Sequence, residues 1–476
     1  MGFWNTAKAR LKQSKSCGPS PDNAAPPNAR HGNGHAQGFL HVRVGDAFSE
    51  GRYVVKGKLG SGTYSTLWLA KDTQTETHVA LKILSSDFYK GTYDLFEVEV
   101  QKTLASVSAN STHPGRKHVA RMLDTFQHQG PNSKHICLVF ELLGATISQQ
   151  TKAAKSLRLP YQMTKHIAIQ VLEALDFIHM ECGVIHTDIQ PSNVLIELPD
   201  PESAVAQALS PQSSTTPSIT LPTPSIFTSP PPAITVRLND FGMACWVSKH
   251  LTDHIQPSLL RAPEITLGAP WDPSVDIYNL GCLLFEFVTG QPPFPGRPSS
   301  RGSYTAEDDR LNTLMQLFGT VPEMVLRNAG RRDEFFDQKA RLKRSPQRGA
   351  TGASTPLEEI VRTPSPRASP RPSLSPPEAE RSRSRGRSAK PLPLASASGD
   401  VVAEQAQAQS QAQAQGSEPD ELPDEEVGVF CDFLKKMMAT DPRERWTAGE
   451  LLRHEWLKPK ISASVSPDGL LCPPAG

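Results

Sequence analysis

The sequence predicts an α+β fold of two lobes, a strand-rich lobe followed by a helical lobe, with two long insertions that cannot build a core. Three observations lead to this prediction. Strand-like segments lie within residues 39–145, helix-like segments follow in three pieces, and two stretches rich in Pro and Ser interrupt the helical part. The three helical pieces are 146–198, 234–340 and 425–460.

The strand-like segments of the first lobe are 52–60, 65–72 and 78–84. Each is rich in β-branched and aromatic residues, and turn-forming residues separate them. Such short runs bounded by turn signals are typical of strands. They predict a strand-rich lobe at the start of the folded chain.

The helix-like segments begin with 93–107 and 164–180, whose apolar residues recur at helical spacing. In the second segment, one face collects Ile167, Val171, Leu172, Leu175 and Ile178. The segment 275–290 is apolar all round, which predicts a buried helix that ends at Gly290.

The insertions are 199–233 and 341–424. Nine prolines fall in the 34 residues 199–232, a density that excludes strand and helix interiors. The second insertion contains the run "RSRSRGRS" at 381–388 and a Gln-Ala tract. Both insertions are expected to be disordered, as are the tail 1–38 and the tail 461–476.

Charge and composition exclude several classes of function. The net charge is +1, with 50 basic and 49 acidic residues, so no global field favours nucleic acid or membrane surfaces. Seven cysteines without a C-x-x-C pair indicate free thiols in a reducing compartment. No apolar run is long enough to span a membrane. Gly2 fits a loose myristoylation pattern and the basic N-terminus faintly resembles a transit peptide, but a disordered tail is favoured.

The stretch "LGSGTYSTLWLA" carries two glycines, Gly60 and Gly62, between two expected strands. Glycines allow a backbone to approach phosphates closely and to present its N–H groups. An ordinary hairpin turn would have the same appearance. The strand–turn–strand setting excludes a Rossmann site, where the motif opens a helix. The candidate phosphate-binding residues are Gly60, Ser61, Gly62, Thr63, Tyr64 and Ser65.

Lys82 lies in the strand-like segment "HVALKIL". A lone strand lysine commonly points to solvent, but one that follows a glycine loop matches the V-A-I-K pattern that holds the α- and β-phosphates of ATP. Its partner should be a glutamate on the next helix. Glu97 is preferred because Val100 and Leu104 then face the core, and Glu99 is the alternative.

The stretch "VIHTDIQPSNVLI" contains Asp188 and Asn193, and "VRLNDFGMA" contains Asp240. In phosphoryl transfer such an aspartate orients the attacking hydroxyl or accepts its proton, while Asn193 and Asp240 would bind magnesium. Asp188 and Asp240 lie 52 positions apart, and 18 without the 34 residues of the first insertion. The two motifs therefore join across that insertion.

Glu264 in "LLRAPEI", Asp276 in the buried helix and Arg445 in "DPRERW" form the last part of the pattern. A buried carboxylate needs a partner. Glu264 is expected to pair with Arg445 across the second insertion, in a structural role.

These motifs, in this order, resemble the eukaryotic protein kinases throughout the folded part, so the resemblance implies the two-lobed protein kinase fold. "VIHTDIQPSNVLI", "HICLVFELLG" and "DFGMACWVSKHLTDHIQPSLLRAPEI" look like the SR-protein kinases, in particular their fungal relatives. That family typically has H-T-D in place of H-R-D and an insertion after the catalytic loop. The resemblance implies a serine/threonine kinase that uses ATP and Mg²⁺ and phosphorylates serines in Arg-Ser-rich proteins.

The resemblance also assigns the rest of the nucleotide site. Phe140 would be the gatekeeper, and Glu141 and Leu143 would offer backbone groups of the hinge. Gln190 stands where most kinases carry the lysine that contacts the γ-phosphate, and it keeps a donor without the charge. The residues expected to enclose adenine are Leu59, Leu67, Ala80 and Leu195.

Thr187 replaces the arginine that usually grips a phosphate on the activation loop, so activity should not need phosphorylation of that loop. The second insertion contributes a separate clue. Its charge blocks usually mean only a solvated segment. A sharper hypothesis is that the Arg-Ser run mimics substrate, and Ser-Pro or Thr-Pro pairs stand at Thr363, Ser365, Ser369 and Ser375.

Two other classes of function compete with a working kinase. A pseudokinase scaffold would explain Gln190 and Ser65, but Lys82, Asp188 and Asn193 are all present. An RNA-binding adaptor lacks an aromatic stacking platform, so no direct nucleic-acid contact is expected. A monomer in the cytoplasm, the nucleus or both is the expectation that accompanies the resemblance.

Overall fold

The structure is a computed structural model that describes residues 38–86, 96–131, 133–210, 218–345, 356–363 and 421–458. The expectations for Gly2 and most of the N-terminal tail, for the Arg-Ser run and for the C-terminal tail lie outside these residues.

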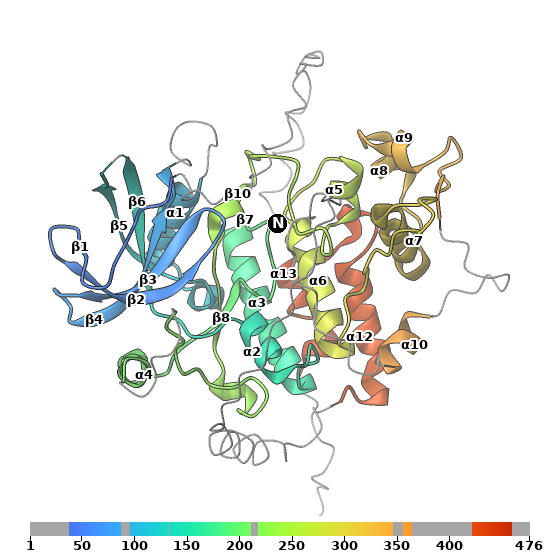
Figure 1. Cartoon of the computed structure of the whole chain (residues 1–476). Coiled ribbons are helices and arrows are strands. Elements are labelled where there is room, and N and C mark those ends of the chain that lie inside the picture. The colour runs from blue at the N-terminus through green and yellow to red at the C-terminus, as the bar shows by residue number, and fades with distance from the viewer. Residues whose placement is uncertain are drawn as a thin grey trace, which may run out of the picture. The chain divides into compact units, whose positions relative to one another are not determined.

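The first lobe is a six-stranded antiparallel sheet in the order β1-β2-β3-β4-β6-β5 (Figure 1). The strands predicted at 52–60, 65–72 and 78–84 correspond to β2, β3 and β4. The six strands are β1 (Ala47–Phe48), β2 (Tyr53–Ser61), β3 (Ser65–Asp72), β4 (Thr77–Leu84), β5 (Met122–Gln129) and β6 (Lys134–Glu141).

Successive side chains of a strand point to opposite faces of the sheet, and β4 shows the consequence for the site. Leu81 is fully buried in one core, together with Val55 and Val139. Ala80 belongs to a different core, and both Ala80 and Lys82 line a cavity. The alternation of the strand therefore directs the lysine toward that cavity.

Helix α1 (Glu97–Asn110) is the helix predicted at 93–107, shifted toward its C-terminus. Val100 and Leu104 are buried, as expected from their spacing after Glu97. Glu97 itself is buried at the first position of the helix, where a carboxylate interacts favourably with the helix dipole. Glu99, the alternative, is exposed.

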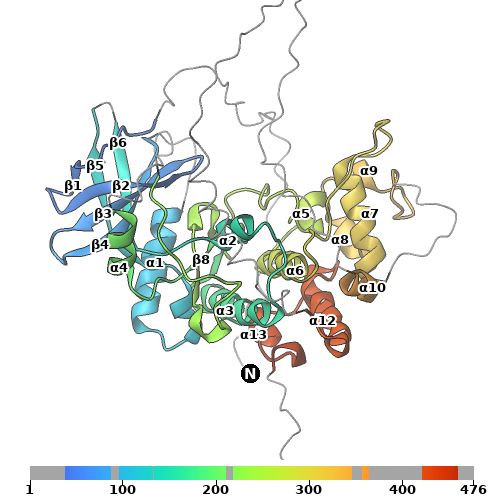
Figure 2. The same ribbon diagram turned by 60° about the horizontal axis from the view of Figure 1, so that its bottom comes forward.

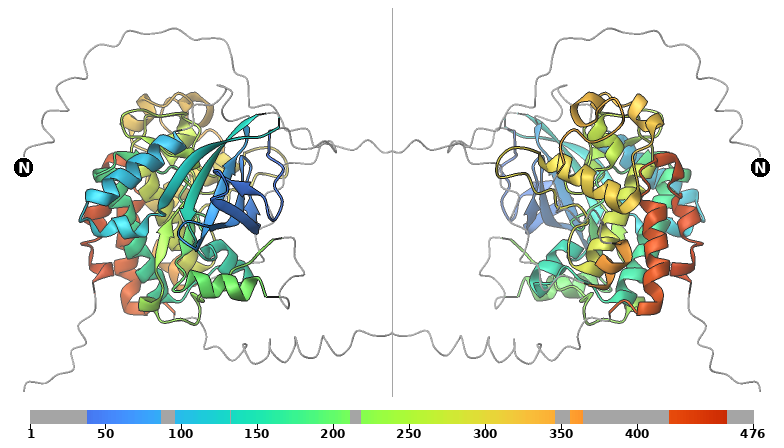
Figure 3. Two further views of the ribbon diagram at one scale, coloured as in Figure 1. Left: turned by 90° about the vertical axis from the view of Figure 1, so that its left-hand side faces the viewer. Right: turned by 90° about the vertical axis from the view of Figure 1, so that its right-hand side faces the viewer.

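The second lobe is helical around α3, α6 and α12, which pack on one another in a single hydrophobic core (Figure 2). The sheet and α12 lie on opposite sides of the views in Figure 3. The helices of this lobe are α2 (Ile147–Ala154), α3 (Tyr161–Met180), α5 (Pro263–Leu267), α6 (Ser274–Thr289), α7 (Ala306–Phe318), α8 (Glu323–Arg327), α9 (Arg332–Phe335), α12 (Asp424–Met437) and α13 (Ala448–Leu451).

The prediction of a buried helix that ends at Gly290 is confirmed. All of α6 except Ser274 is buried. Gly290 adopts the left-handed conformation with φ 77°, which costs a glycine little because it has no Cβ. Short strands complete the lobe: β7 (Val184–Ile185) pairs with β10 (Cys245–Trp246), and β8 (Val194–Ile196) pairs with β9 (Val236–Leu238).

The expectation that the first insertion lacks structure is wrong for its described residues. Helix α4 (Pro201–Ala208) begins with Asp200 as N-cap and a proline in its first turn, where the missing N–H is not needed. Beyond it, Leu221 and Ile226 are buried without forming regular structure. Prolines excluded an element interior, but they did not exclude packing of the apolar residues between them.

The second insertion also contains a short described element. Helix α10 (Leu357–Arg362) packs on α12 through the buried residues Leu357 and Val361, so the expectation of disorder is wrong for this segment. Within the described residues, no helix is long and apolar enough to cross a membrane. The five cysteines of the described segments are buried free thiols, as predicted.

Candidate active site

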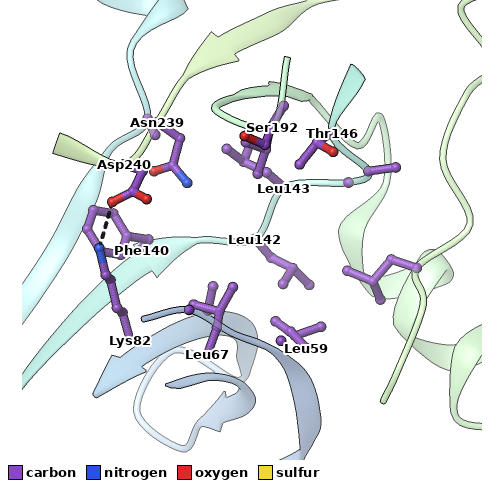
Figure 4. A pocket seen from close by; sticks show the side chains of 18 of the residues that line it. Leu59, Leu67, Lys82, Phe140, Leu142, Leu143, Thr146, Ser192, Asn239 and Asp240 are labelled. Carbon is purple, nitrogen blue, oxygen red and sulfur yellow. Dashed lines mark hydrogen bonds and ion pairs between the residues drawn. The ribbon is translucent and has the colours of Figure 1, made fainter. Parts of the chain in front are cut away.

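A cavity of about 470 Å³ lies between the sheet and the helical lobe. Figure 4 shows Leu59 and Leu67 on the sheet side, with Leu142, Leu143 and Thr146 on the segment that leaves β6. Every residue assigned to adenine, gatekeeper and hinge lines this cavity. They are Leu59, Leu67, Ala80, Phe140, Glu141, Leu143 and Leu195.

The glycine loop connects β2 to β3 at the edge of the cavity, where Gly62 N donates to Ser65 O over 2.9 Å. A Cβ added at Gly60 would meet no atom within 4 Å, so there is open space beside this backbone. Gly60, Ser61, Gly62 and Ser65 line the cavity. Thr63 and Tyr64 are exposed and are not among the lining residues, so they lie farther out than predicted.

The ammonium group of Lys82 connects Glu97 of α1 with Asp240, which follows β9 in the helical lobe. Lys82 Nζ lies 2.5 Å from Glu97 Oε1. It also lies 3.0 Å from Asp240 Oδ1, the contact drawn as a dashed line in Figure 4. Burial alone would lower the pKa of Lys82, but the charges of Glu97 and Asp240 outweigh it and hold the pKa above its usual value. The lysine is therefore a fixed cation at the cavity wall, with the predicted glutamate as its partner.

Asp240 occupies the left-handed backbone conformation with φ 63°, which is uncommon for residues other than glycine. Burial would raise the pKa of its carboxyl, but the Lys82 ammonium lowers it below its usual value. Strained conformations of this kind occur where a side chain must be aimed. Here the carboxylate stays ionised and is half-exposed toward the cavity.

The catalytic-loop residues converge on Asp188. One oxygen of its carboxylate accepts hydrogen bonds from Gln190 Nε2 at 2.8 Å and from Asn193 Nδ2 at 2.9 Å. Asn193 Nδ2 also donates to Asp188 O over 2.9 Å. Two amides thus fix the orientation of the carboxylate. Asn193 lines the cavity, whereas Asp188 and Gln190 lie just beyond its lining residues.

Asp276 of α6 holds the start of this loop. Its two carboxylate oxygens accept from His186 N and Thr187 N at 2.8 Å each, and its Oδ2 lies 2.9 Å from His179 Nε2. Thr187 has φ 66°, a strained value for a β-branched residue. Sequence reasoning placed Asp276 in a buried helix but did not find these partners, because they depend on how α6 crosses the loop.

The residues proposed for the metal fit a divalent cation. Asn193 donates through its Nδ2, so its amide oxygen has only a long contact of 3.5 Å from Ser192 Oγ. Asp240 adds a carboxylate oxygen, and both residues line one cavity. Magnesium commonly uses one or two carboxylates together with substrate phosphates and water. Among the described residues no group of three His, Cys, Asp or Glu forms a separate metal site.

The predicted structural ion pair is present. Arg445 forms two hydrogen bonds with the Glu264 carboxylate, at 2.6 and 2.8 Å, and both side chains are fully buried. The Arg445 guanidinium also lies over the ring of Tyr278, 4.9 Å from the ring centroid, which is within the range of a cation–π contact. This pair ties α5 to the region after α12.

Several cavity-lining residues were not predicted, and besides two continuous sets they are Ala120, Gln149, Ser192 and Asn239. Leu142 and Gly144 to Thr146 extend the hinge, and their position next to Phe140 was a usable signal. Residues 218–221 of the first insertion also line the cavity, and no motif or periodicity marks them.

The fold has two lobes, with a glycine loop and a lysine–glutamate pair at the cavity between them. Asp188, hydrogen-bonded to Asn193, and Asp240 lie at the same cavity. These features together define the protein kinase class. The protein kinase domain model matches residues 53–340, and the chain belongs to the protein kinase family. It is an SR-protein kinase-like member and a protein serine/threonine kinase, which uses ATP and a divalent metal.

The relatives agree with this placement. The chain is 30% identical to protein kinase dsk1 of Schizosaccharomyces pombe, over 65% of this chain and 73% of that protein. It is 32% identical to serine/threonine-protein kinase SRPK of Physarum polycephalum, over 70% and 82%. It is 24% identical to SRSF protein kinase 3 of Mus musculus, over 89% of each chain.

Proposed function

We propose that this kinase transfers the γ-phosphoryl group of Mg-ATP directly to serine hydroxyls in Arg-Ser-rich proteins. The observation that carries the proposal is that Lys82, Asn193 and Asp240 line one cavity and that Asp188 is hydrogen-bonded to Asn193 beside it. This arrangement supports a working kinase, because a pseudokinase usually lacks one of these groups.

Each residue has a defined task in this proposal. Lys82, held by Glu97, would bind the α- and β-phosphates, and the backbone around Gly60 would cover them. Asn193 and Asp240 would hold Mg²⁺, which bridges phosphate oxygens and offsets their charge. Asp188 would orient the serine hydroxyl and accept its proton. Its carboxylate is fixed by Gln190 and Asn193, so little reorganisation is needed at the moment of transfer.

The substrate class rests on the relatives and not on the cavity. One relative is named SRPK, and another is named as an SRSF protein kinase. The histidine–threonine–aspartate sequence at 186–188 and an insertion between β8 and β9 fit the resemblance to that family. We also propose that the kinase acts as a monomer in the cytoplasm, the nucleus or both, which light scattering and fluorescence imaging would test.

We further propose that activity does not require phosphorylation of the segment after Asp240. The Thr187 hydroxyl donates to Met243 O over 2.9 Å, so it joins the catalytic loop to this segment without a phosphate. Protein made in bacteria and treated with phosphatase should keep its full rate of phosphoryl transfer. A preparation that becomes active only after incubation with another kinase would contradict this proposal.

The function is tested by transfer of radiolabelled phosphate from Mg-ATP to an Arg-Ser repeat peptide, with a scrambled basic peptide as comparison. Asp240→Asn serves as the matched control because it keeps the size of the side chain and removes the charge that would hold metal. Labelling of the repeat peptide that is lost in the control is the expected result. Absence of labelling, with ATP still bound, would favour a scaffold.

A further inference from the structure

The described end of the first insertion crosses the mouth of the nucleotide cavity. Residues 218–221 line the cavity, and Ile219 N donates to Lys58 O of β2 over 2.7 Å. The Ile219 side chain lies over Gly57, where an added Cβ would come within 2.2 Å of Ile219 Cδ1. Helix α4 is attached to the same lobe, because its Glu202 carboxylate accepts a hydrogen bond from His78 N of β4 over 2.6 Å.

The other end of this segment is attached to the hinge and the helical lobe. Thr223 Oγ1 accepts a hydrogen bond from Ala145 N over 2.9 Å. Gln150 of α2 donates to Pro224 O at 2.9 Å and accepts from Ile226 N at 3.2 Å. Ile226 is fully buried in the core of the helical lobe. Residues 218–226, here called the strap, therefore connect the two lobes across the cavity.

Thr223 is the residue at which the strap meets the hinge most tightly. Besides the bond from Ala145 N, its hydroxyl donates to Leu221 O over 2.9 Å. A Cβ added at Gly144 would lie 2.6 Å from Thr223 Oγ1 and 2.7 Å from its methyl group. The hinge has a glycine at this position, and the strap occupies the space that a side chain there would need.

The sequence around Thr223 is suited to modification. Thr223 is followed by Pro224, it is partly exposed, and the strap contains no helix or strand from 218 to 225. A residue before proline prefers an extended backbone, the form in which kinases read a substrate segment. A phosphate would add about two negative charges where the Thr223 hydroxyl is hydrogen-bonded to Ala145 N and Leu221 O, and such a group would disrupt this contact with the hinge.

We propose that Thr223 is a phosphorylation site for a proline-directed protein kinase, and that its phosphorylation releases the strap from the mouth of the nucleotide cavity. The Thr223 oxygen attacks the γ-phosphorus of ATP held by the modifying kinase. The new O–P bond forms as the bond to the β–γ bridging oxygen breaks, ADP leaves, and the hydroxyl proton passes to that kinase's base. The inference rests on the proposed function, since it takes the cavity as the nucleotide site.

Modification would trap an open form of the strap that the unmodified protein visits only briefly. The strap is then expected to slow the exit of nucleotide in the unmodified protein, and the phosphorylated protein should release ADP faster. Because the strap contacts both lobes across the mouth, its release should raise the rate at which nucleotide leaves, and a chase experiment measures that rate directly.

The first experiment measures the rate at which fluorescent mant-ADP dissociates from the full-length protein in the presence of Mg²⁺. Stopped flow follows the fluorescence after excess unlabelled ADP is added as a chase. Thr223→Glu should release mant-ADP about tenfold faster, the equivalent of about 1.4 kcal/mol. Thr223→Val keeps the shape but loses the bond from Ala145 N, and it should show a smaller increase. Ser229→Glu is the matched control, since Ser229 also precedes a proline in the same insertion, and its rate should stay within twofold of wild type.

The second experiment treats the full-length protein with a recombinant mitogen-activated kinase and maps the phosphate by mass spectrometry. We expect phosphate on Thr223, faster mant-ADP release in the wild type, and no acceleration in Thr223→Val. Chymotryptic cleavage after Phe227, which is followed by Thr228, gives a readout that needs no nucleotide, and it should increase in Thr223→Glu but not in Ser229→Glu.

The outcomes separate this inference from the proposed function. If the wild type binds mant-ADP but Thr223→Glu matches Ser229→Glu in both release and cleavage, the strap inference is overturned and the kinase function stands. Thr223 that stays unmodified while Ser229 is phosphorylated would also overturn it. Failure of the wild type to bind mant-ADP would contradict the proposed function, and the cleavage pattern would still decide whether Thr223 holds the strap.

Discussion

At the scale of single residues, Gln190 shows how the catalytic loop works without the usual lysine. Its amide nitrogen lies 2.8 Å from Asp188 Oδ2, so it helps to orient the carboxylate that would receive the serine proton. The same amide can donate to a phosphate oxygen, although without a full charge. The residue is therefore both a positioning group and a candidate donor to the transferred phosphate.

Gln190→Ala should lower kcat by roughly 10²-fold, because a preorganised donor at a charged transition state is removed. The KM for ATP should change little. Gln190→Lys should retain at least the wild-type rate, since the lysine restores a cation. Steady-state kinetics with an Arg-Ser peptide would measure both. An alanine variant with full activity would show that the amide has no part in transfer.

Asp72 offers a residue-scale prediction on pH and stability. Its carboxylate accepts from Arg52 Nε at 3.0 Å and Nη2 at 2.9 Å, and this pairing holds the pKa of Asp72 below its usual value. A lowered pKa in the folded state favours the ionised form, so its stabilisation is present above the unfolded pKa of about 4 and is lost as pH falls through the folded pKa.

Asp72→Asn should therefore reduce the free energy of unfolding at pH 7, and the difference from wild type should shrink as the pH falls below about 4. Urea unfolding at a series of pH values would measure this difference. Glu99→Gln, which removes an exposed carboxylate, serves as the control. A difference that stays constant from pH 7 down to the acid limit would show that the Arg52 contact does not stabilise the fold.

At the scale of elements, the Glu264–Arg445 pair links α5 to the 3₁₀ turn Pro442–Glu444 through fully buried charges. Removal of one partner leaves an uncompensated buried charge, which typically destabilises a protein by about 3–5 kcal/mol. Arg445→Met should therefore lower the free energy of unfolding by about that amount, as measured by urea denaturation. Glu264→Leu combined with Arg445→Met should recover most of the loss. A double variant as unstable as the single one would argue against a simple ion pair.

The elements also show what a sequence can predict. The phase of the helix after β4 identified Glu97, because Val100 and Leu104 had to face the core. The pairing of Glu264 with Arg445 followed from the requirement that a buried charge has a partner. The strap was not predicted, because Ile219 and Leu221 belong to no periodic pattern. Ile219 lies against Gly57, and both residues share a hydrophobic cluster with the adenine-facing residues. These contacts alone make them part of the site.

Other differences have the same kind of cause. Helix α4 was missed because a proline in a first turn was counted as evidence against a helix, although the first turn is where proline is accepted. Thr63 and Tyr64 were assigned to phosphate binding by their place in a motif, but the hairpin between β2 and β3 carries them to the exposed side. Motif spacing identifies the loop, while the conformation of the hairpin decides which of its members face a ligand.

At the scale of the whole molecule, the part of the second insertion between α10 and α12 is flanked by two helices that pack together. Leu357 and Val361 of α10 are buried against α12, and Lys435 Nζ lies 2.9 Å from Glu358 Oε1. The ends of the intervening segment are thus held by contacts of their own. Catalytic geometry should be independent of the residues between them.

A deletion of residues 364–420, joined by a short Gly-Ser linker, should leave the unfolding midpoint and kcat on a short peptide nearly unchanged, within about 0.5 kcal/mol for stability. Calorimetry and peptide kinetics would measure both quantities. Deletion of 356–363 as well should be destabilising, because two buried side chains are lost. A large loss of peptide activity in the first variant would show that the insertion acts on the active site itself.

The pairing of β8 with β9 has a consequence for how such a chain can change over time. Val194 lies opposite Leu238 and Ile196 opposite Val236, so the whole first insertion is topologically the loop of a small hairpin. The entropy of closing a loop grows only with the logarithm of its length, and doubling the length adds about 0.6 kcal/mol. New residues could therefore accumulate between Asn193 and Asp240 at little thermodynamic cost. Any segment inserted there is connected to the two strands that lead to the nucleotide cavity, so it lies close to the nucleotide from the start.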